Sequence, residues 1–298
     1  MSDTLPPQRP GDPARSAVAS GDTAVPASAP APVAETKTGK TEEEEKPFWP
    51  FLLKLVIAVF IFRAFLFSPF TIPSESMLPR LQTGDYLAAQ KWPYGYSRWS
   101  MPFNAPILPG RVFADTPERG DVVIFKHPVD KSDYIKRVIG LPGDTVQMRS
   151  GVLILNGQAI PKQRIDDFLL PASANTACYA GFAERGTSGE EVCRYPRYRE
   201  TLPNGVAYDT LDLGAGNLDS TTPVVVPEGQ LFLMGDNRDN SLDSRVPAVA
   251  GGGIGLVDQD LLVGKASAVL WSTDGSAEWI KPWTWFSAAR WDRMGDGI

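Results

Sequence analysis

Two serines in the segment Thr71 to Asp85 (TIPSESMLPRLQTGD) have the residue type and the setting for nucleophilic chemistry. Ser74 and Ser76 lie between Pro73 and Pro79, and proline restricts the backbone on either side. The segment is therefore expected to form an irregular, held loop on which a serine can be aimed at a substrate. Serine, proline and glycine also cluster in ordinary turns, so this segment alone does not define a site.

A serine hydroxyl needs a base before it can act as a nucleophile, and the chain offers few. Its one histidine, His127, lies in FKHPVD, which predicts a strand end or an exposed turn, so we interpret His127 as a surface residue. A neutral lysine can take the place of histidine. Lys136, in the apolar run YIKRVI, is the candidate. Because adjacent strand residues face opposite sides, an inward Lys136 would place Arg137 outward.

An ordinary lysine is a poor base at neutral pH. At a pKa of about 10.4, only about four lysines in ten thousand are uncharged at pH 7. Burial among isoleucine, valine, methionine and tyrosine side chains disfavours the ammonium form, and a pKa lowered by about two units would leave several per cent neutral. We therefore expect a working Lys136 to be buried. The alternative is a basic pair on the surface.

A third candidate is the polar run Gly235 to Arg245 (GDNRDNSLDSR), which directly follows the apolar run LFLM. Its aspartate, asparagine, serine and arginine side chains predict a hydrogen-bonded loop. Functional groups are often carried by a loop at the end of a strand. The alternative is a solvated turn.

Composition excludes several classes of function. The chain of 298 residues has a formal net charge of -6, whereas a nucleic-acid partner would require a basic face. Two cysteines and one histidine supply neither the number nor the spacing of a zinc site. The serine and lysine chemistry needs no metal or cofactor, so we predict none.

The N-terminal region divides into two parts. Residues 1–46 are rich in Pro, Ala, Ser, Thr and Gly, and we predict a disordered tail. The 23 residues from Phe48 to Phe70 are apolar except for Lys54, Arg63 and Ser68. As a helix they would extend about 34 Å, which is enough to cross a hydrocarbon core of about 30 Å while both charged groups reach the headgroups.

Three interpretations of this apolar segment compete. Charges on opposite sides disfavour a buried core helix, and the long tail before the segment together with SPF after it disfavours a cleavable signal peptide. We therefore predict an uncleaved transmembrane anchor over residues 47–70. Three lysines in the tail, with few basic residues soon after the span, predict a cytoplasmic tail and a remainder on the other side of the membrane.

Beyond the anchor the pattern is typical of a β protein. Asn156-Gly157 between apolar runs predicts a hairpin, and no long amphipathic helix is evident between residues 85 and 280. We predict a mainly β fold with an antiparallel sheet built from residues 71–160 and 224–275. The strongest strand signals are Asp121 to Lys126, Tyr134 to Ile139, Val152 to Leu155, Val224 to Val226 and Leu231 to Met234.

Two segments differ from the main β domain in amino-acid composition. Residues 161–223 contain both cysteines and predict an inserted, smaller β-rich lobe in which Cys178 and Cys193 pair under oxidising conditions; two unpaired thiols are the alternative. Residues 276–298 suit either the membrane interface or a cap on the β core. Their aromatic side chains are Trp279, Trp283, Trp285, Phe286 and Trp291.

Taken together, four segments resemble the signature boxes of the bacterial type I signal peptidases, also called leader peptidases. They occur in that family's order after a membrane anchor, within residues 48 to about 150 and 224 to about 270. The resemblance implies a membrane serine endopeptidase with an antiparallel β-sheet catalytic domain. The four segments are PSESM (Pro73 to Met77), RGDVVIF (Arg119 to Phe125), DYIKRVIGLPGD (Asp133 to Asp144) and GDNRDNSLDSR (Gly235 to Arg245).

The resemblance also implies roles for individual residues. It makes Ser76 the nucleophile and Lys136 the general base, while the Ser74 hydroxyl joins the Ser76 N–H in an oxyanion hole. Supporting roles fall to Ser241, Asp243 and Arg245. The residues implied to line the pockets for small substrate side chains are Ile72, Met77, Leu81, Tyr134 and Ile135.

The implied partners are the signal peptides of exported preproteins and the lipid bilayer. The implied location is the bacterial inner membrane, with a single span and the catalytic domain on the periplasmic side.

The sequence departs from the family at Glu75, where glycine is common; we expect this side chain to point to solvent beside the cleft. Two alternatives are a membrane-tethered β binding module without catalysis and a Ser/Lys self-cleaving repressor. The anchor and the lack of a basic DNA-binding region disfavour the repressor.

Overall fold

A computed structural model describes residues 48–105, 108, 110–278 and 280–298 of the chain. The tail predicted to be disordered, residues 1–46, and Trp279 lie outside the described residues. The described part is a mainly β structure in which antiparallel sheets follow one apolar helix, as predicted.

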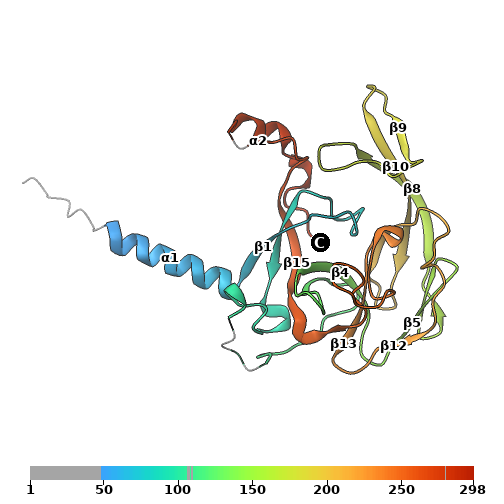
Figure 1. Cartoon of the computed structure of the whole chain (residues 1–298), viewed down its shortest axis with the longest axis horizontal. Coiled ribbons are helices and arrows are strands. Elements are labelled where there is room, and N and C mark those ends of the chain that lie inside the picture. Colours follow the sequence, from blue (N-terminus) through green and yellow to red (C-terminus); the bar gives the residue numbers. More distant parts are fainter. Residues whose placement is uncertain (1–47, 106–107, 109, 279) are drawn as a thin grey trace, which may run out of the picture. The chain divides into compact units, whose positions relative to one another are not determined.

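Helix α1 (Phe48–Phe65) is the apolar helix, and it extends away from the strands (Figure 1). Its 18 residues have a mean hydropathy of 2.0, and only 6% of them are buried. By length and composition it can cross a membrane. The helix ends five residues before the predicted limit of Phe70, because Phe67–Thr71 instead form strand β1 around Pro69, a residue that lacks the N–H a helix requires.

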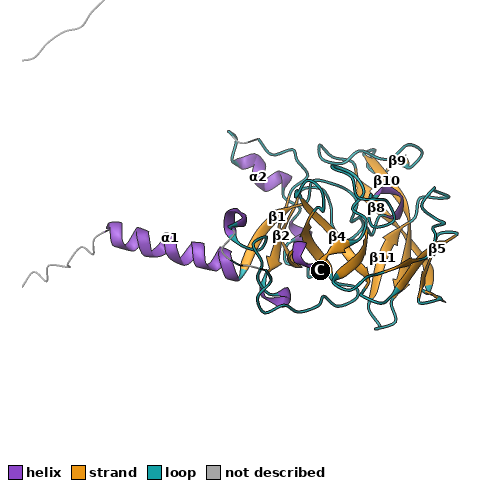
Figure 2. Cartoon of the chain, turned by 60° about the horizontal axis from the view of Figure 1, so that its bottom comes forward, coloured by secondary structure: helices purple, strands orange, loops and turns teal. Residues whose placement is uncertain are grey.

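The main sheet has the order β1-β2-β15-β3-β4-β13-β14, and all of its neighbouring strands are antiparallel. Figure 2 labels three of its strands, β1, β2 and β4. Strands β3 and β4 are at its centre, and Lys136 on β4 pairs with Val123 on β3. The candidate base therefore comes from an inner strand. Besides β1, the strands are β2 (Asp85–Gln90), β3 (Val122–Lys126), β4 (Asp133–Gly140), β13 (Gln230–Met234), β14 (Val257–Asp258) and β15 (Leu262–Ser272).

A second sheet has the order β12-β5-β6-β7. The predicted hairpin is present between β6 and β7, where Asn156 has φ 52° and Gly157 has φ 80°. Asparagine and glycine tolerate this left-handed backbone, which a two-residue hairpin turn requires. The strands are β5 (Thr145–Arg149), β6 (Val152–Leu155), β7 (Gln158–Ala159) and β12 (Val224–Val225).

Residues 161–223 contribute a sheet of their own, with the order β11-β10-β8 and β9 paired to β10. The Cys178–Cys193 disulfide is formed, as predicted, and it joins a loop of this insertion to β10. Two of its residues, Leu202 and Tyr208, pack with the second sheet. The strands are β8 (Lys162–Pro171), β9 (Ala183–Arg185), β10 (Glu191–Thr201) and β11 (Ala207–Leu211).

Both faces of the β3–β4 pair are covered, which corrects one prediction. Ile124 and Ile135 belong to one core cluster and Val123 to another. Arg137 was predicted to face outward, but it is only 6% exposed. Strand alternation gives the side on which a residue lies, and it does not show what covers that side.

The interpretation of His127 as a surface residue is wrong, because its side chain is fully buried. The N–H groups of Val129 and Asp130 lie 3.2 and 3.4 Å from Nδ1, and Nε2 lies 3.2 Å from the Gly253 carbonyl oxygen. The turn after Pro128 folds back over the ring. Both nitrogens are thus engaged by backbone groups, and neither is left to activate a serine.

The aromatic C-terminal segment contains helix α2 (Trp283–Ala288). Trp283 and Phe286 are each 69% exposed, whereas Trp291 contacts Trp271 of β15 edge-on, with 5.7 Å between ring centres. One part of the segment therefore contacts the sheet and another part faces outward. The 3-10 helices are η1 (Trp92–Tyr94), η2 (Pro102–Asn104), η3 (Arg238–Asn240), η4 (Gln259–Leu261) and η5 (Trp291–Arg293).

Candidate active site

The loop that carries Ser76 is held by backbone hydrogen bonds. The Ile72 N–H donates to the Asp85 carbonyl at 2.8 Å, and the Gly84 N–H donates to the Ile72 carbonyl at 3.0 Å. The Asn237 N–H donates to the Ser76 carbonyl at 3.1 Å, which fixes the loop to the polar run. Ser76 is therefore an oriented residue, and only 7% of it is exposed.

Lys136 reaches Ser76 from strand β4. The Lys136 Nζ lies 2.6 Å from the Ser76 Oγ, a distance at which a proton can pass between the two atoms. Lys136 is 4% exposed, as its apolar strand predicted. Burial lowers its pKa to about 8, although the Asp243 and Asp236 carboxylates oppose the shift.

Ser74 lies at the open side of this pair. Its Oγ is 3.4 Å from the Ser76 Oγ, and its side chain is exposed. A hydroxyl at this distance can donate to an oxygen that develops charge next to Ser76.

The polar run after β13 supports the pair from behind. Asp243 and Arg245 form a fully buried ion pair with an Nε–Oδ1 distance of 2.8 Å, and the Gly235 N–H donates to Asp243 Oδ2 at 3.1 Å. A Cβ on Gly235 would lie 2.2 Å from the Ser241 Oγ and 2.6 Å from the Ser76 carbonyl oxygen. Only glycine allows the three segments to approach this closely.

Two further buried ion pairs tie the polar run to other strands. Arg137 donates from two nitrogens to the Asp236 carboxylate, at 2.7 and 2.6 Å. Arg238 donates in the same way to Glu200 of β10, at 2.7 and 2.5 Å. The polar run is thus a cross-linked structural element and not a solvated turn.

A groove of about 430 Å³ opens onto the pair, and Ser74, Ser76 and Lys136 line it. Ile72, Tyr134 and Ile135 line it as well. Met77 and Leu81 were also assigned to substrate pockets; they are fully buried in the core cluster beneath the loop and are absent from the lining. Ser241 lines the groove, whereas Asp243 and Arg245 lie behind it.

Sequence reasoning missed several residues of the groove. Leu218 comes from the insertion, and Leu242 lies inside the polar run, where its neighbours predicted only hydrogen bonding. Ile124 is on β3 beside the base, so strand pairing with YIKRVI could have indicated it. Nothing in the sequence near Leu218 marks it. Among the described residues, no group of three or more His, Cys, Asp or Glu side chains could hold a metal ion.

The chain is similar to known proteins of one family. The family model described as signal peptidase, peptidase S26 matches residues 47–271. Signal peptidase I of Rickettsia typhi is 37% identical over 248 residues, which cover 80% of this chain and 83% of that protein. Signal peptidase I of Rickettsia prowazekii is 35% identical over 246 residues, covering 79% and 83%. A solved signal peptidase I from Enterococcus faecalis is 25% identical and covers 51% of this chain and 97% of its own, with a TM-score of 0.27.

Proposed function

Because the chain belongs to the signal peptidase I family of serine endopeptidases, we propose that it cleaves signal peptides with a dyad of Ser76 and neutral Lys136. The observation that supports the dyad most directly is the 2.6 Å separation of Nζ and Oγ in a buried setting. With a pKa of about 8, about one Lys136 in ten is neutral at pH 7, compared with fewer than one in a thousand for an ordinary lysine.

The first half of the reaction forms an acyl-enzyme. Neutral Lys136 accepts the Ser76 hydroxyl proton as Oγ attacks the carbonyl carbon of the scissile bond. The carbonyl oxygen becomes an oxyanion, to which the Ser74 hydroxyl and the Ser76 N–H donate. The Lys136 ammonium then returns the proton to the leaving amine, and the C–N bond breaks.

The second half releases the signal peptide. A water molecule gives a proton to Lys136, which is neutral again, and its oxygen attacks the ester carbon. The same donors hold the second oxyanion, and the proton returns to the Ser76 Oγ as the ester bond breaks. Lys136 alternates between its two protonation states, and no net proton is consumed at the dyad.

Three residues of the polar run keep this geometry. Ser241 is buried and lines the groove with Lys136, and its hydroxyl has no hydrogen-bond partner within the described residues, so it can form a further hydrogen bond there. The Asp243–Arg245 ion pair fixes the end of β13 through Gly235. These residues act by positioning and electrostatics and form no bond to the substrate.

The groove sets the substrate class. Its apolar walls at Ile72, Tyr134 and Ile135 suit an extended peptide with small side chains before the cut, such as the end of a signal peptide. Met77 and Leu81 contribute from beneath by fixing the shape of the loop.

Helix α1 is proposed to anchor the enzyme in the bacterial inner membrane as a single span, with the catalytic domain on the periplasmic side. The apolar, exposed surface of the helix supports the membrane span, and the lysines of the tail support the orientation. The exposed rings of Trp283 and Phe286 would lie at the membrane interface. A bilayer is thus proposed as the second partner besides the signal peptide.

The test is cleavage of one exported preprotein by the full chain in detergent micelles, with mass spectrometry of both products. Wild type should release the signal peptide at one bond, and Ser76→Ala should bind the preprotein without cutting it. Binding without cleavage by wild type would favour a tethered binding module, and cleavage of the enzyme's own chain alone would favour the self-cleaving alternative. Equal turnover by Ser76→Ala would rule out the proposed nucleophile.

A further inference from the structure

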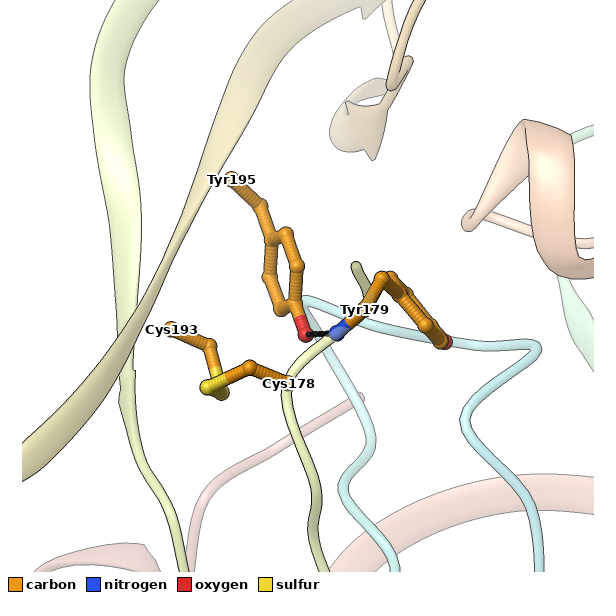
Figure 3. Close-up of a disulfide and its surroundings, with 4 residues drawn as sticks. All are labelled: Cys178, Tyr179, Cys193 and Tyr195. Atoms are coloured by element: carbon orange, nitrogen blue, oxygen red, sulfur yellow. Dashed lines mark hydrogen bonds between the residues drawn. A yellow bond between two sulfur atoms is a disulfide. The ribbon is translucent and has the colours of Figure 1, made fainter. Parts of the chain in front are cut away.

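Tyr179, in the inserted lobe, contacts the part of the molecule that carries the nucleophile. It follows Cys178, whose disulfide to Cys193 joins this loop to strand β10 (Figure 3). The Tyr179 N–H donates to the Tyr195 hydroxyl at 3.2 Å, and the two rings pack with 5.1 Å between their centres. Tyr195 is fully buried. The disulfide and these ring contacts fix the loop at Tyr179 against strand β10.

The hydroxyl of Tyr179 reaches the polar run and the Ser76 loop. It accepts hydrogen bonds from the Asn237 Nδ2, at 3.2 Å, and from the Asn240 Nδ2. The Glu75 carboxylate is its third neighbour and accepts a hydrogen bond from it. Burial and this carboxylate raise the pKa of Tyr179, so the hydroxyl remains a donor at all working pH values. Glu75 was expected to point to solvent, but it is half-buried against Tyr179 and does not line the groove.

These contacts hold the residues on both sides of Ser76. Asn237 donates through Nδ2 to the Glu75 carbonyl at 3.1 Å and through its N–H to the Ser76 carbonyl. Leu78, two residues after Ser76, is fully buried in a cluster with Cys193 and Tyr195. The insertion therefore packs against the Ser76 loop and supports it.

We propose that Tyr179 is a positioning residue for the Ser76 loop, that the Cys178–Cys193 disulfide holds it in place, and that Glu75 is its partner on that loop. This inference rests on the proposed role of Ser76. A displacement of a reacting atom by about 1 Å can slow catalysis by about 100-fold, so a hydroxyl that fixes the residue next to the nucleophile affects turnover without touching the substrate.

The decisive variant is Tyr179→Phe, which removes one hydroxyl and keeps the ring. We expect kcat for a preprotein to fall about tenfold while KM stays within about twofold and the unfolding temperature is unchanged. The matched control is Tyr198→Phe on strand β10 of the same lobe. Its ring lies beside Lys162 and Arg164, and it should behave as wild type. A Tyr179→Phe enzyme with wild-type kcat, or with a raised KM alone, would overturn the proposal.

A double-mutant cycle with Glu75→Ala separates positioning from general destabilisation. If Tyr179 acts through Glu75, Tyr179→Phe should cost clearly less in the Glu75→Ala background than in wild type. Fully additive losses, or losses that follow the unfolding temperature, would overturn the inference. Reduction and alkylation of the disulfide should lower kcat of wild type and have little further effect on Tyr179→Phe. Cleavage by wild type but not by Ser76→Ala, measured alongside, shows whether the proposed function itself holds.

Discussion

Two of the lysines that the described part of the chain buries, Lys136 and Lys91, lie in different regions and have different neighbours. Lys136 on β4 and Lys91, just after β2, are each 4% exposed. Each has a pKa of about 8, lowered chiefly by burial. Exposure and pKa therefore do not distinguish the two side chains, so the difference must lie in what surrounds each amine.

Lys91 is a structural hydrogen-bond donor at the C-terminal end of helix α1. Its Nζ donates to the Arg63 carbonyl at 2.8 Å and to the Ser100 carbonyl at 2.5 Å, and its N–H donates to the Leu66 carbonyl at 3.1 Å. Tyr96 donates its hydroxyl to the Phe65 carbonyl beside it, at 2.8 Å. Carbonyl oxygens at a helix C-terminus lack intrahelical donors, and a lysine there satisfies them.

The comparison shows that a lowered lysine pKa is not enough to identify a base. Carbonyl oxygens have no proton to give, so Lys91 can only donate to them. The partner of Lys136 is a hydroxyl, which can release a proton, and a groove leads to it. A perturbed pKa indicates burial, and the chemistry of the nearest atom decides the role.

The largest expected effect sharpens this contrast. Lys136→Met should lower kcat/KM for a preprotein by at least about 1,000-fold, because the base is lost. Lys91→Met removes an equally buried amine and should leave kcat within about twofold for a short soluble peptide substrate. If the two variants lost activity equally, the assignment of the base to Lys136 would fail.

The next effect concerns the hydroxyl beside the dyad. Ser74→Ala should reduce kcat by about 100-fold, since an oxyanion donor is lost while nucleophile and base remain. The matched control is Ser68→Ala, whose hydroxyl donates to the Arg63 carbonyl in the Lys91 region, at 3.1 Å. Ser68→Ala should retain wild-type kcat. A fully inactive Ser74→Ala enzyme would instead place Ser74 within the nucleophilic step.

A third prediction uses pH. In the proposed mechanism the active form of Lys136 is neutral, so below its pKa of about 8 kcat/KM should fall about tenfold for each pH unit, and above it the rate should level off. Lys91→Met should leave this profile unchanged, which would show that the titration belongs to Lys136. A flat profile between pH 6 and 10, or a midpoint that moves in Lys91→Met, would contradict the comparison.

The local sequence singled out Ser76 and Lys136, which lie 2.6 Å apart in the structure, because short motifs carry both residues. Ser76 and Lys136 each lie in a run whose neighbours restrict its conformation, and the hairpin at Asn156 followed from turn chemistry alone. The errors arose where distant segments decide the environment. His127 and Arg137 are buried by covering segments that no local pattern reveals.

Hydrogen-bond partners that lie far apart in the sequence could not be predicted for the same reason. Tyr179 meets Asn237 across 58 residues, and Lys91 meets Arg63 across 28. Each contact depends on which strands pair, and the insertion has no motif that fixes its pairing. The fold class was predictable from strand and turn signals, whereas the packing of the insertion against the Ser76 loop was not.

The smallest expected effect is on stability. In the folded state each lysine has a pKa below its unfolded value of 10.5, so between about pH 8 and 10.5 the unfolded chain binds more protons and the free energy of unfolding rises with pH. At neutral pH both buried ammonium groups oppose folding. Lys136→Met should therefore raise the free energy of unfolding by about 1–3 kcal/mol.

Lys91→Met removes the same opposing charge but takes away the Ser100 carbonyl's donor, at a cost of about 1–3 kcal/mol, whereas the Arg63 carbonyl keeps the Ser68 hydroxyl as a donor. We expect it to be less stable than Lys136→Met by about 1–3 kcal/mol. Thermal unfolding of both variants in detergent at pH 7 measures the difference. Equal stabilisation would mean that the carbonyl contacts of Lys91 contribute nothing, and the two lysines would then differ only in access to the groove.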